Sequence, residues 1–236
     1  MKILAIETST MAGSVALADG GELVSEYLLN IKVTHSERLV SAIDTLLKDA
    51  RTPISEIDGF ALSMGPGSFT GLRIGMSTVK GLAFATNKPV VGIPTLDALA
   101  QNVLFSDSLI CPILDARKKE VYSALYKRAH GDKLRKLTAE LAIKPRDLTK
   151  KIEERVVFLG DGIDVYKELI KEELGDLAVF APLNLRLPRA ASVAKLGLHE
   201  FQKNNVLNVN EISPFYVRLS EAEQKFNERH LVSTMK

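Results

Sequence analysis

The hydrophobic residues in the first half of the chain fall into two kinds of stretch. Short apolar runs bounded by turn residues are typical of buried strands, and they occur at 2–8, 14–18, 22–29, 57–63 and 90–93. Longer stretches repeat their apolar residues at helical spacing, which predicts helices over 36–50, 68–85 and 94–104. Asp19-Gly20-Gly21 favours a tight hairpin, and Thr34-His35-Ser36-Glu37 predicts a capping box before the first helix.

The second half of the chain repeats this order. Strands are predicted at 109–114, 120–127, 134–137, 156–160 and 177–181, and helices at 145–154, 164–174 and 190–203. Two such βββαβαβα halves predict an α/β protein with two mixed sheets and helices packed on them. This layout resembles that of the actin-like ATPase (ASKHA, ribonuclease H-like) fold of actin, hexokinase and Hsp70. We expect an N-terminal lobe over 1–106 and a C-terminal lobe over 107–236, with the tail from about 212 packing back on the first lobe.

A glycine-rich turn and helix stand at the centre of the first half. Gly65-Pro66-Gly67 forces a sharp turn after a buried strand, and Ser68 or Thr70 can cap the helix that follows. A helical glycine costs roughly 1 kcal/mol against alanine, yet this helix keeps Gly71, Gly75 and Gly81. Such small residues admit another backbone, either the protein's own sheet or a helix of another chain. Phosphate binding by the turn is a third alternative, which the lack of a following Gly-Lys-Ser/Thr disfavours.

Composition and charge exclude several classes of protein. No apolar run approaches the ~20 residues of a membrane span. The apolar run within residues 1–7 is too short for a secretory signal, and it is followed at once by a charged residue. The single cysteine, Cys111, excludes an internal disulfide. We therefore expect a cytoplasmic protein without membrane contact. The net charge of +2 permits contact with RNA but does not argue for it.

Four motifs in order carry a resemblance over nearly the whole chain. They are Lys2-Ile3-Leu4-Ala5-Ile6-Glu7-Thr8-Ser9-Thr10, the segment 65–73, Asp115-Ala116-Arg117-Lys118-Lys119-Glu120-Val121-Tyr122, and Pro214-Phe215-Tyr216-Val217-Arg218. Together they resemble the TsaB (YeaZ) family. The resemblance implies a part in placing a threonylcarbamoyl group on adenosine 37 of tRNAs that read ANN codons.

The resemblance also implies partners. Members of the family are non-catalytic partners of a paralogous transferase, TsaD, and a small ATPase, TsaE, is the third component. On this basis we expect no cofactor on this chain, with ATP, threonylcarbamoyl-AMP and metal on the partner subunits. We expect tRNA to be contacted indirectly, and a homodimer to form when the partner is absent.

The residues at two expected sites agree with a non-catalytic role. The first phosphate turn of the superfamily reads Asp-x-Gly-Thr, but here Glu7 replaces the aspartate and Ser9 the glycine, next to Thr8. The metal-binding histidine pair of the transferase corresponds to Thr95 and Leu99, and leucine cannot ligate a metal. We therefore expect a lost metal site and a polar strand end at Glu7, Thr8 and Ser9, which at most lies near the cleft or a nucleotide.

The segment that opens the second half allows two interpretations. Asp115, Arg117, Glu120 and Tyr122 stand where the second phosphate turn of the superfamily would lie. A structural salt bridge between strands is favoured slightly over a position lining the cleft and facing a partner.

The predicted partner surface comprises the helices over 36–50 and 68–85, two of which from each chain could form a four-helix interface. Its residues are Leu39, Ile43, Leu46, Ser68, Phe69, Gly71, Leu72, Arg73, Gly75, Met76 and Val79. Two rival functions remain. A stand-alone ATPase or small-molecule kinase would need an intact first phosphate turn, and a metal-dependent, glycoprotease-like peptidase would need metal ligands at 95 and 99.

Overall fold

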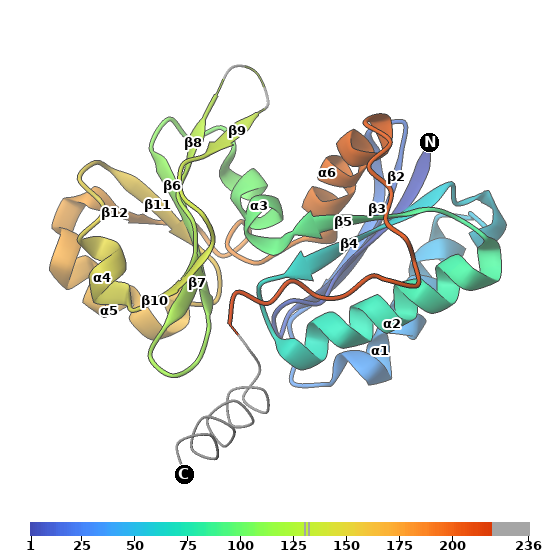
Figure 1. Cartoon of the computed structure of the whole chain (residues 1–236), viewed down its shortest axis with the longest axis horizontal. Helices are drawn as coiled ribbons and strands as arrows, with labels where there is room; N and C mark the ends of the chain where they lie inside the picture. The colour runs from blue at the N-terminus through green and yellow to red at the C-terminus, as the bar shows by residue number, and fades with distance from the viewer. Residues whose placement is uncertain (130, 132, 219–236) are drawn as a thin grey trace, which may run out of the picture.

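The computed structural model describes residues 1–129, 131 and 133–218. In this part of the chain the strands form two sheets, one in each of two lobes that lie side by side (Figure 1). None of the helices described there is long and apolar enough to cross a membrane.

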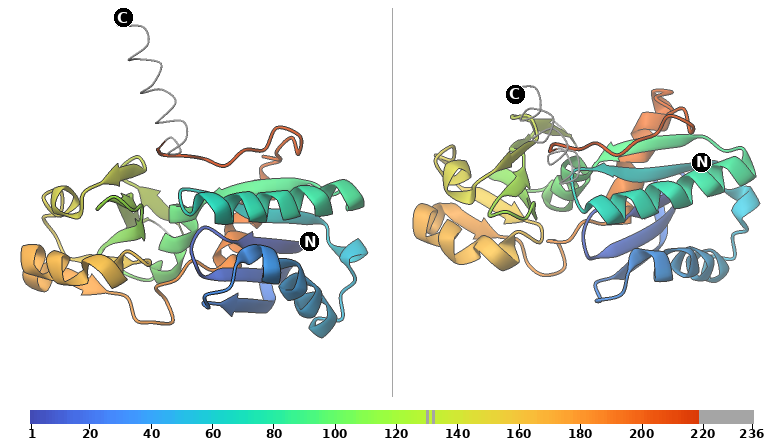
Figure 2. Two further views of the ribbon diagram at one scale, coloured as in Figure 1. Left: turned by 90° about the horizontal axis from the view of Figure 1, so that it is seen from below. Right: turned by 60° about the horizontal axis from the view of Figure 1, so that its bottom comes forward.

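The first lobe follows the predicted order closely. Its elements are β1 (Lys2–Glu7), β2 (Gly13–Asp19), β3 (Glu22–Leu29), α1 (His35–Asp49), a 3-10 turn (Ile54–Glu56), β4 (Gly59–Gly65), α2 (Phe69–Thr86), β5 (Val90–Pro94), α3 (Thr95–Ala100) and a second 3-10 turn (Gln101–Val103). The sheet order is β3-β2-β1-β4-β5, with the first three strands antiparallel and the last three parallel. Helices α1 and α2 lie side by side on one face of this sheet, as Figure 2 shows.

The second lobe repeats this sheet with an added hairpin. Its elements are β6 (Leu109–Asp115), β7 (Val121–Ser123), β8 (Tyr126–Arg128), β9 (Leu134–Lys136), β10 (Leu141–Ile143), α4 (Pro145–Thr149), β11 (Val156–Leu159), α5 (Ile163–Leu174), a 3-10 turn (Gly175–Leu177) and β12 (Ala178–Phe180). Helix α6 (Ala190–Gln202) follows in the chain. The main path of the sheet is β10-β7-β6-β11-β12, which matches the order of the first sheet.

Three predicted elements of the second half need correction. The strand predicted at 120–127 is two strands, because Leu125 N donates to Thr138 Oγ1 (2.9 Å) where the ladder is interrupted. The strand at 134–137 is not the third strand of the repeat; β9 pairs with β8, and the unpredicted β10 pairs with β7. Helix α4 ends at Thr149, because the chain turns there and buries Ile152 in the core.

The last helix of each half packs across the lobe boundary. Helix α6 covers the free face of the first sheet, where Ala190, Val193 and Ala194 meet Ile3 and Ala5. Helix α3 contributes Leu96 and Leu99 to the core of the second lobe. Residues 190–202 therefore belong with the first lobe, and a boundary drawn by sequence position alone assigns them wrongly.

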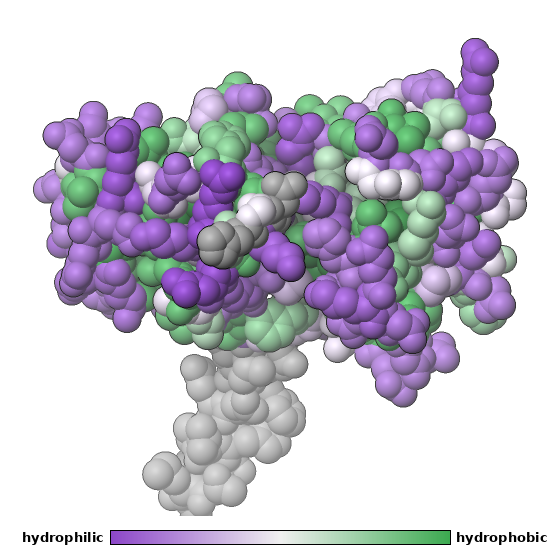
Figure 3. Space-filling view, turned by 90° about the horizontal axis from the view of Figure 1, so that it is seen from above, coloured by the Kyte–Doolittle hydropathy of each residue, from purple (hydrophilic) through white to green (hydrophobic). Residues whose placement is uncertain are grey.

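The tail after α6 also lies against the first lobe. Leu207 N donates to Val90 O (2.8 Å), and Phe215 N donates to Met64 O (2.7 Å). In Figure 1 this segment, coloured red, then runs toward the second lobe. The face with the β8–β9 hairpin is mostly hydrophilic and carries only small hydrophobic patches, as Figure 3 shows.

Candidate functional site

The strand end that replaces the first phosphate turn is closed. Glu7 is fully buried, and its Oε1 accepts a hydrogen bond from Ser9 N (2.6 Å). Its Oε2 finds no partner among the described residues. Burial raises the pKa of the Glu7 carboxyl, because a charge is costly away from water. A buried carboxyl of this kind is unsuited to positioning metal-bound water at a phosphate.

The glycine turn and the start of α2 lie directly on this strand end. Ser68 N donates to Ser9 O (2.6 Å), and a β-carbon on Gly67 would clash with the Ser9 backbone. One turn later, a β-carbon on Gly71 would clash with the Thr8 carbonyl, and one on Gly75 with the Thr8 hydroxyl. These glycines therefore admit the protein's own chain directly after strand β1.

The partner-facing interpretation of Gly71 and Gly75 is thereby corrected. Glycine is required at both positions because another segment packs closely against them. That segment belongs to the same chain. Gly81 differs, because a β-carbon placed there would meet no described atom within 4 Å apart from its chain neighbours and the adjacent backbone of its own helix.

Most of the remaining predicted partner residues also face the core. The apolar side chains of the two helices bury against the first sheet, because an amphipathic helix turns its apolar stripe inward; they are Leu39, Ile43, Leu46, Leu72, Met76 and Val79. Of the predicted surface, only Ser68, Phe69 and Arg73 are exposed. The outward faces instead carry Val40 on α1, 65% exposed, and Phe84 on α2, 87% exposed. Sequence reasoning missed both; an apolar residue outside the main stripe was the available signal.

The turn between β6 and β7 is held by its own side chains. Asp115 Oδ1 accepts from Arg117 N (2.9 Å), and Asp115 Oδ2 pairs with the Arg117 guanidinium (3.1 Å). This ion pair lies within the turn, whereas the sequence favoured a salt bridge between strands. The backbone of Arg117, Lys118 and Lys119 is left-handed, with φ of 61°, 51° and 62°. L-residues adopt this region at a cost, so the turn stores strain.

The C-terminal strap, residues 214–218, joins this turn to the first lobe. Tyr216 stacks on Phe69 with ring centroids 5.1 Å apart, and its hydroxyl accepts from Arg73 Nε (3.0 Å). Arg218 then donates to Glu120 Oε2 (2.8 Å) and to Ala116 O (2.9 Å). The strap therefore bridges the two lobes through charge-assisted hydrogen bonds at the second lobe.

A cleft of about 850 Å³ lies between the lobes, under the strap. Of the predicted cleft residues, Ser9, Asp115, Arg117 and Tyr122 line it. Glu7 and Thr8 lie behind this wall, and Glu120 is engaged by Arg218.

Asp161 also lines the cleft, and sequence reasoning missed it. It follows β11 and accepts from Asp115 N (3.0 Å). Burial raises the pKa of its carboxyl to about 6. The available signal was Gly160-Asp161-Gly162 at the end of a buried strand, where ligand-binding loops of α/β sheets begin.

The positions that correspond to the histidine pair of the transferase are enclosed in the protein. Thr95 and Leu99 are fully buried, and Thr95 Oγ1 accepts from Gly65 N (3.2 Å). Within the described ranges, no three His, Cys, Asp or Glu side chains cluster as metal ligands would. Leu99 offers no ligand atom, and the Thr95 hydroxyl already accepts a hydrogen bond within the core.

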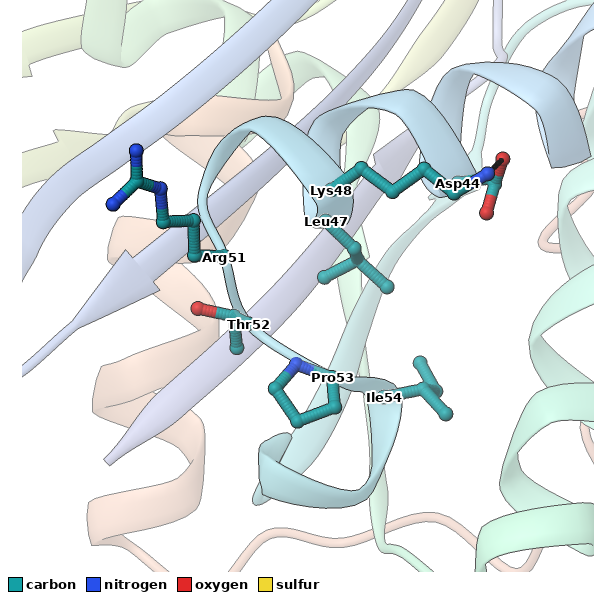
Figure 4. Close-up of a pocket in the computed structure, with 7 residues that line it drawn as sticks. All are labelled: Asp44, Leu47, Lys48, Arg51, Thr52, Pro53 and Ile54. Atoms are coloured by element: carbon teal, nitrogen blue, oxygen red, sulfur yellow. Dashed lines mark hydrogen bonds and ion pairs between the residues drawn. The ribbon is translucent and has the colours of Figure 1, made fainter.

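A second hollow of about 330 Å³ lies at the end of α1 (Figure 4). The residues that line it, 44–54, are far in the sequence from Thr95 and Leu99. Its Lys48 is already paired with Asp44 (2.7 Å). No other acidic and basic side chains are paired among the residues that line this hollow, and the arrangement does not indicate a catalytic or binding site.

The fold and the glycine-covered strand end define a class of protein: two lobes of the actin-like ATPase fold. In a comparison with solved structures, the activator of the 2-hydroxyisocaproyl-CoA dehydratase from Clostridium difficile, with bound ADPNP, has a TM-score of 0.50 at 10% identity. It covers 88% of this chain and 99% of its own. At this identity the likeness shows the fold alone, and the predicted fold class is confirmed.

Closer relatives give the family. The family model "TsaD: tRNA N6-adenosine threonylcarbamoyltransferase" matches residues 23–226. The tRNA threonylcarbamoyladenosine biosynthesis proteins TsaB of Bacillus subtilis and Escherichia coli are 32% and 30% identical, over 97% and 95% of this chain and 99% and 98% of theirs. YeaZ from Pseudomonas aeruginosa aligns with a TM-score of 0.79 at 28% identity, covering 91% of this chain and 99% of its own. The chain belongs to the TsaB (YeaZ) family, whose named members take part in the biosynthesis of threonylcarbamoyladenosine in tRNA.

Proposed function

We propose that this chain is a non-catalytic scaffold subunit, the pseudoenzyme partner of a TsaD-type transferase that modifies adenosine 37 of ANN-decoding tRNAs. The observation that carries the proposal is the enclosure of Thr95 and Leu99 in the core, at the positions of the paralogue's metal ligands. The buried Glu7 adds support, since it leaves no open carboxylate at the first phosphate turn.

The partner surface in this proposal is the outward face of α1 and α2. Val40 and Phe84 are large apolar side chains exposed on neighbouring helices, and such residues are typical anchors of an interface. Gly81, open to solvent on α2, lets a partner helix approach closely. The same face could bind a second copy of this chain when the transferase is absent.

Co-purification with a TsaD-type transferase tests this surface. Val40→Glu and Phe84→Glu should each abolish pairing, because they place an unpaired charge in an apolar contact. Both side chains are exposed, so the variants should remain folded. Phe105→Glu is the matched control, since Phe105 is 68% exposed but lies outside both helices. Normal pairing by both interface variants would refute the proposed surface.

The remaining components belong to the partners in this account. ATP, threonylcarbamoyl-AMP and metal are held by the transferase and a TsaE-type ATPase, tRNA is contacted through the transferase, and assembly takes place in the cytoplasm. Glu7→Ala should then change the nucleotide affinity of the assembled complex by less than about threefold, under ~1 kcal/mol. A hundredfold loss without loss of assembly would assign a nucleotide site to this chain and favour the ATPase alternative.

A further inference from the structure

The β8–β9 hairpin stands out from the second lobe (Figure 1). It lies off the main path of the second sheet, because β8 pairs with β6 and β9 pairs with β8. Among the strands of the described residues, the first sheet has no counterpart of this hairpin. Its segment, 126–136, holds five lysine and arginine residues and one aspartate, Asp132, which lies outside the described residues. The hairpin is therefore a strongly basic addition to the architecture that the two lobes share.

The inner face of the hairpin is anchored in the protein. Tyr126 is 2% exposed, and its hydroxyl donates to Asp97 Oδ1 on α3 (2.7 Å). Leu134 packs against the core cluster that contains Tyr126. Lys136 forms ion pairs with Asp97 (2.6 Å) and Glu140 (2.9 Å). These contacts fix the hairpin on the second lobe, so the side chains of its other face stand on a rigid support.

The outer face of the hairpin carries three basic side chains. Lys127 stands directly opposite Arg135 in the pairing of β8 with β9. The pairing continues toward the turn, where Ala129 N donates to Lys133 O (2.9 Å). Side chains two residues apart in a strand share a face, so Lys133 lies on the same face as Arg135 and Lys127. Lys133 and Arg135 are exposed to solvent, and Lys127 is half-buried.

This arrangement of charges is unfavourable for the hairpin itself. Like charges directly opposite each other destabilise a pair of antiparallel strands, and Lys127 faces Arg135 in this way. Glu154 offsets the charge of Lys127, because both its oxygens accept from the Lys127 Nζ (2.9 and 2.7 Å). Arg135 and Lys133 form no ion pair with any described residue. The outer face therefore keeps an excess of positive charge that an external anion would balance.

We propose that the outer face of the β8–β9 hairpin binds RNA through its phosphate backbone, and that this RNA is the tRNA of the proposed complex. A polyanion engages several cations at once, and an exposed pair such as Lys127 with Glu154 is weak enough to exchange for a phosphate. Phosphate contacts position a nucleic acid without reading its sequence, so this face suits any ANN-decoding tRNA. The choice of tRNA rests on the proposed function. The contact adds to the one through the transferase, which holds the reacting adenosine.

Fluorescence anisotropy of a labelled, unmodified ANN-decoding tRNA, titrated with the full chain, tests this contact. Binding should weaken steeply as salt rises, because each neutralised phosphate releases counterions. Arg135→Glu should weaken binding about tenfold and lower the slope of log K against log salt by about 1. Arg135→Lys should bind nearly as tightly as the wild type, because a backbone phosphate is held by charge.

A matched variant and a second readout separate this role from a structural one. Lys171→Glu makes the same charge reversal at an exposed position on α5, away from the hairpin in Figure 1, and should alter affinity by less than about twofold. Arg135→Glu removes the like charge opposite Lys127, so in thermal unfolding it should be at least as stable as the wild type. A purely structural role for Arg135 predicts a lower unfolding temperature instead.

Three results would overturn the proposal. They are no binding of tRNA at about 50 mM salt and about 100 μM chain, equal weakening by Arg135→Glu and Lys171→Glu, or a polyglutamate peptide bound as tightly as tRNA, which would make the hairpin a docking surface for an acidic protein. The chain is titrated alone, so failure here leaves the pairing with a transferase through α1 and α2 untouched. Conversely, normal pairing by Val40→Glu and Phe84→Glu would refute the scaffold surface without affecting the titration.

Discussion

The backbone of Gly75 lies against the side chain of Thr8, and no β-carbon fits between α2 and the end of β1. The contact holds the turn that begins at Thr8 against the glycine-rich helix α2. It explains why this helix keeps a residue of poor helix propensity at that position.

Gly75→Ala should therefore destabilise the protein, whereas Gly81→Ala should not. At position 75 the added methyl clashes with the Thr8 hydroxyl, and overpacking typically costs about 1–3 kcal/mol. At position 81 the methyl meets open space, and helix propensity improves by up to about 1 kcal/mol. Chemical denaturation of both variants measures the difference. Equal stability of the two would show that α2 does not lie on β1 as described.

Asp161→Asn should stabilise the protein at neutral pH. The raised pKa of about 6 means that the fold favours the neutral carboxyl. The protonated Asp161 carboxyl contributes fully to stability below the pKa that this carboxyl has in the unfolded chain. That contribution is lost as the pH rises through about 6, where the carboxyl ionises in the folded protein. The advantage of the variant should grow between pH 4 and pH 7.5, by up to about 3 kcal/mol. Asp176→Asn, on the surface, is the control; parallel pH profiles for Asp161→Asn and the wild type would contradict the prediction.

Lys119→Gly should relieve strain in the turn between β6 and β7. Lys119 has a left-handed backbone, which glycine adopts without steric cost. The free energy of unfolding should rise by roughly 0.5–1 kcal/mol. Lys88→Gly, at a position without this conformation, should lower it. A loss of stability in Lys119→Gly would show that the turn is not strained.

The double variant Thr95→His, Leu99→His should gain neither zinc binding nor transferase activity. Both side chains are fully buried, so two imidazoles would overpack the core at a cost of about 2 kcal/mol or more. Calorimetry with zinc and thermal unfolding measure the two effects. A folded variant that binds zinc tightly would show that the metal site was lost by side-chain replacement alone.

The sequence predicted the first lobe almost element by element, because its strands are long, apolar and bounded by clear turns. It predicted the second lobe less well. The strands β7 to β10 have three residues each, too few for a period to be recognised, and β7 pairs with β10 across the intervening β8–β9 hairpin. The crossing of α6 to the first sheet could not be predicted, because an apolar helix face does not specify which sheet it covers.

The site shows the same limit. Spacing placed Gly71 and Gly75 on one stripe correctly, but a small-residue stripe does not reveal whether its neighbour is a sheet or a second chain. Leu39 and Ile43 were predicted on the partner surface because their helix was assigned to that surface. An amphipathic helix that lies on a sheet buries its apolar stripe, and both residues belong to that stripe. Asp161 joins the cleft only through tertiary contact with Asp115, 46 positions away in the sequence.

Reconstitution of tRNA modification tests the scaffold account most directly. The purified chain, a TsaD-type transferase and a TsaE-type ATPase are combined with ATP and an unmodified ANN-decoding tRNA, and threonylcarbamoyladenosine is measured by mass spectrometry of the digested tRNA. The account predicts modification by the full mixture, little or none when this chain is omitted, and none by this chain alone. Modification of tRNA by the purified chain alone would contradict it.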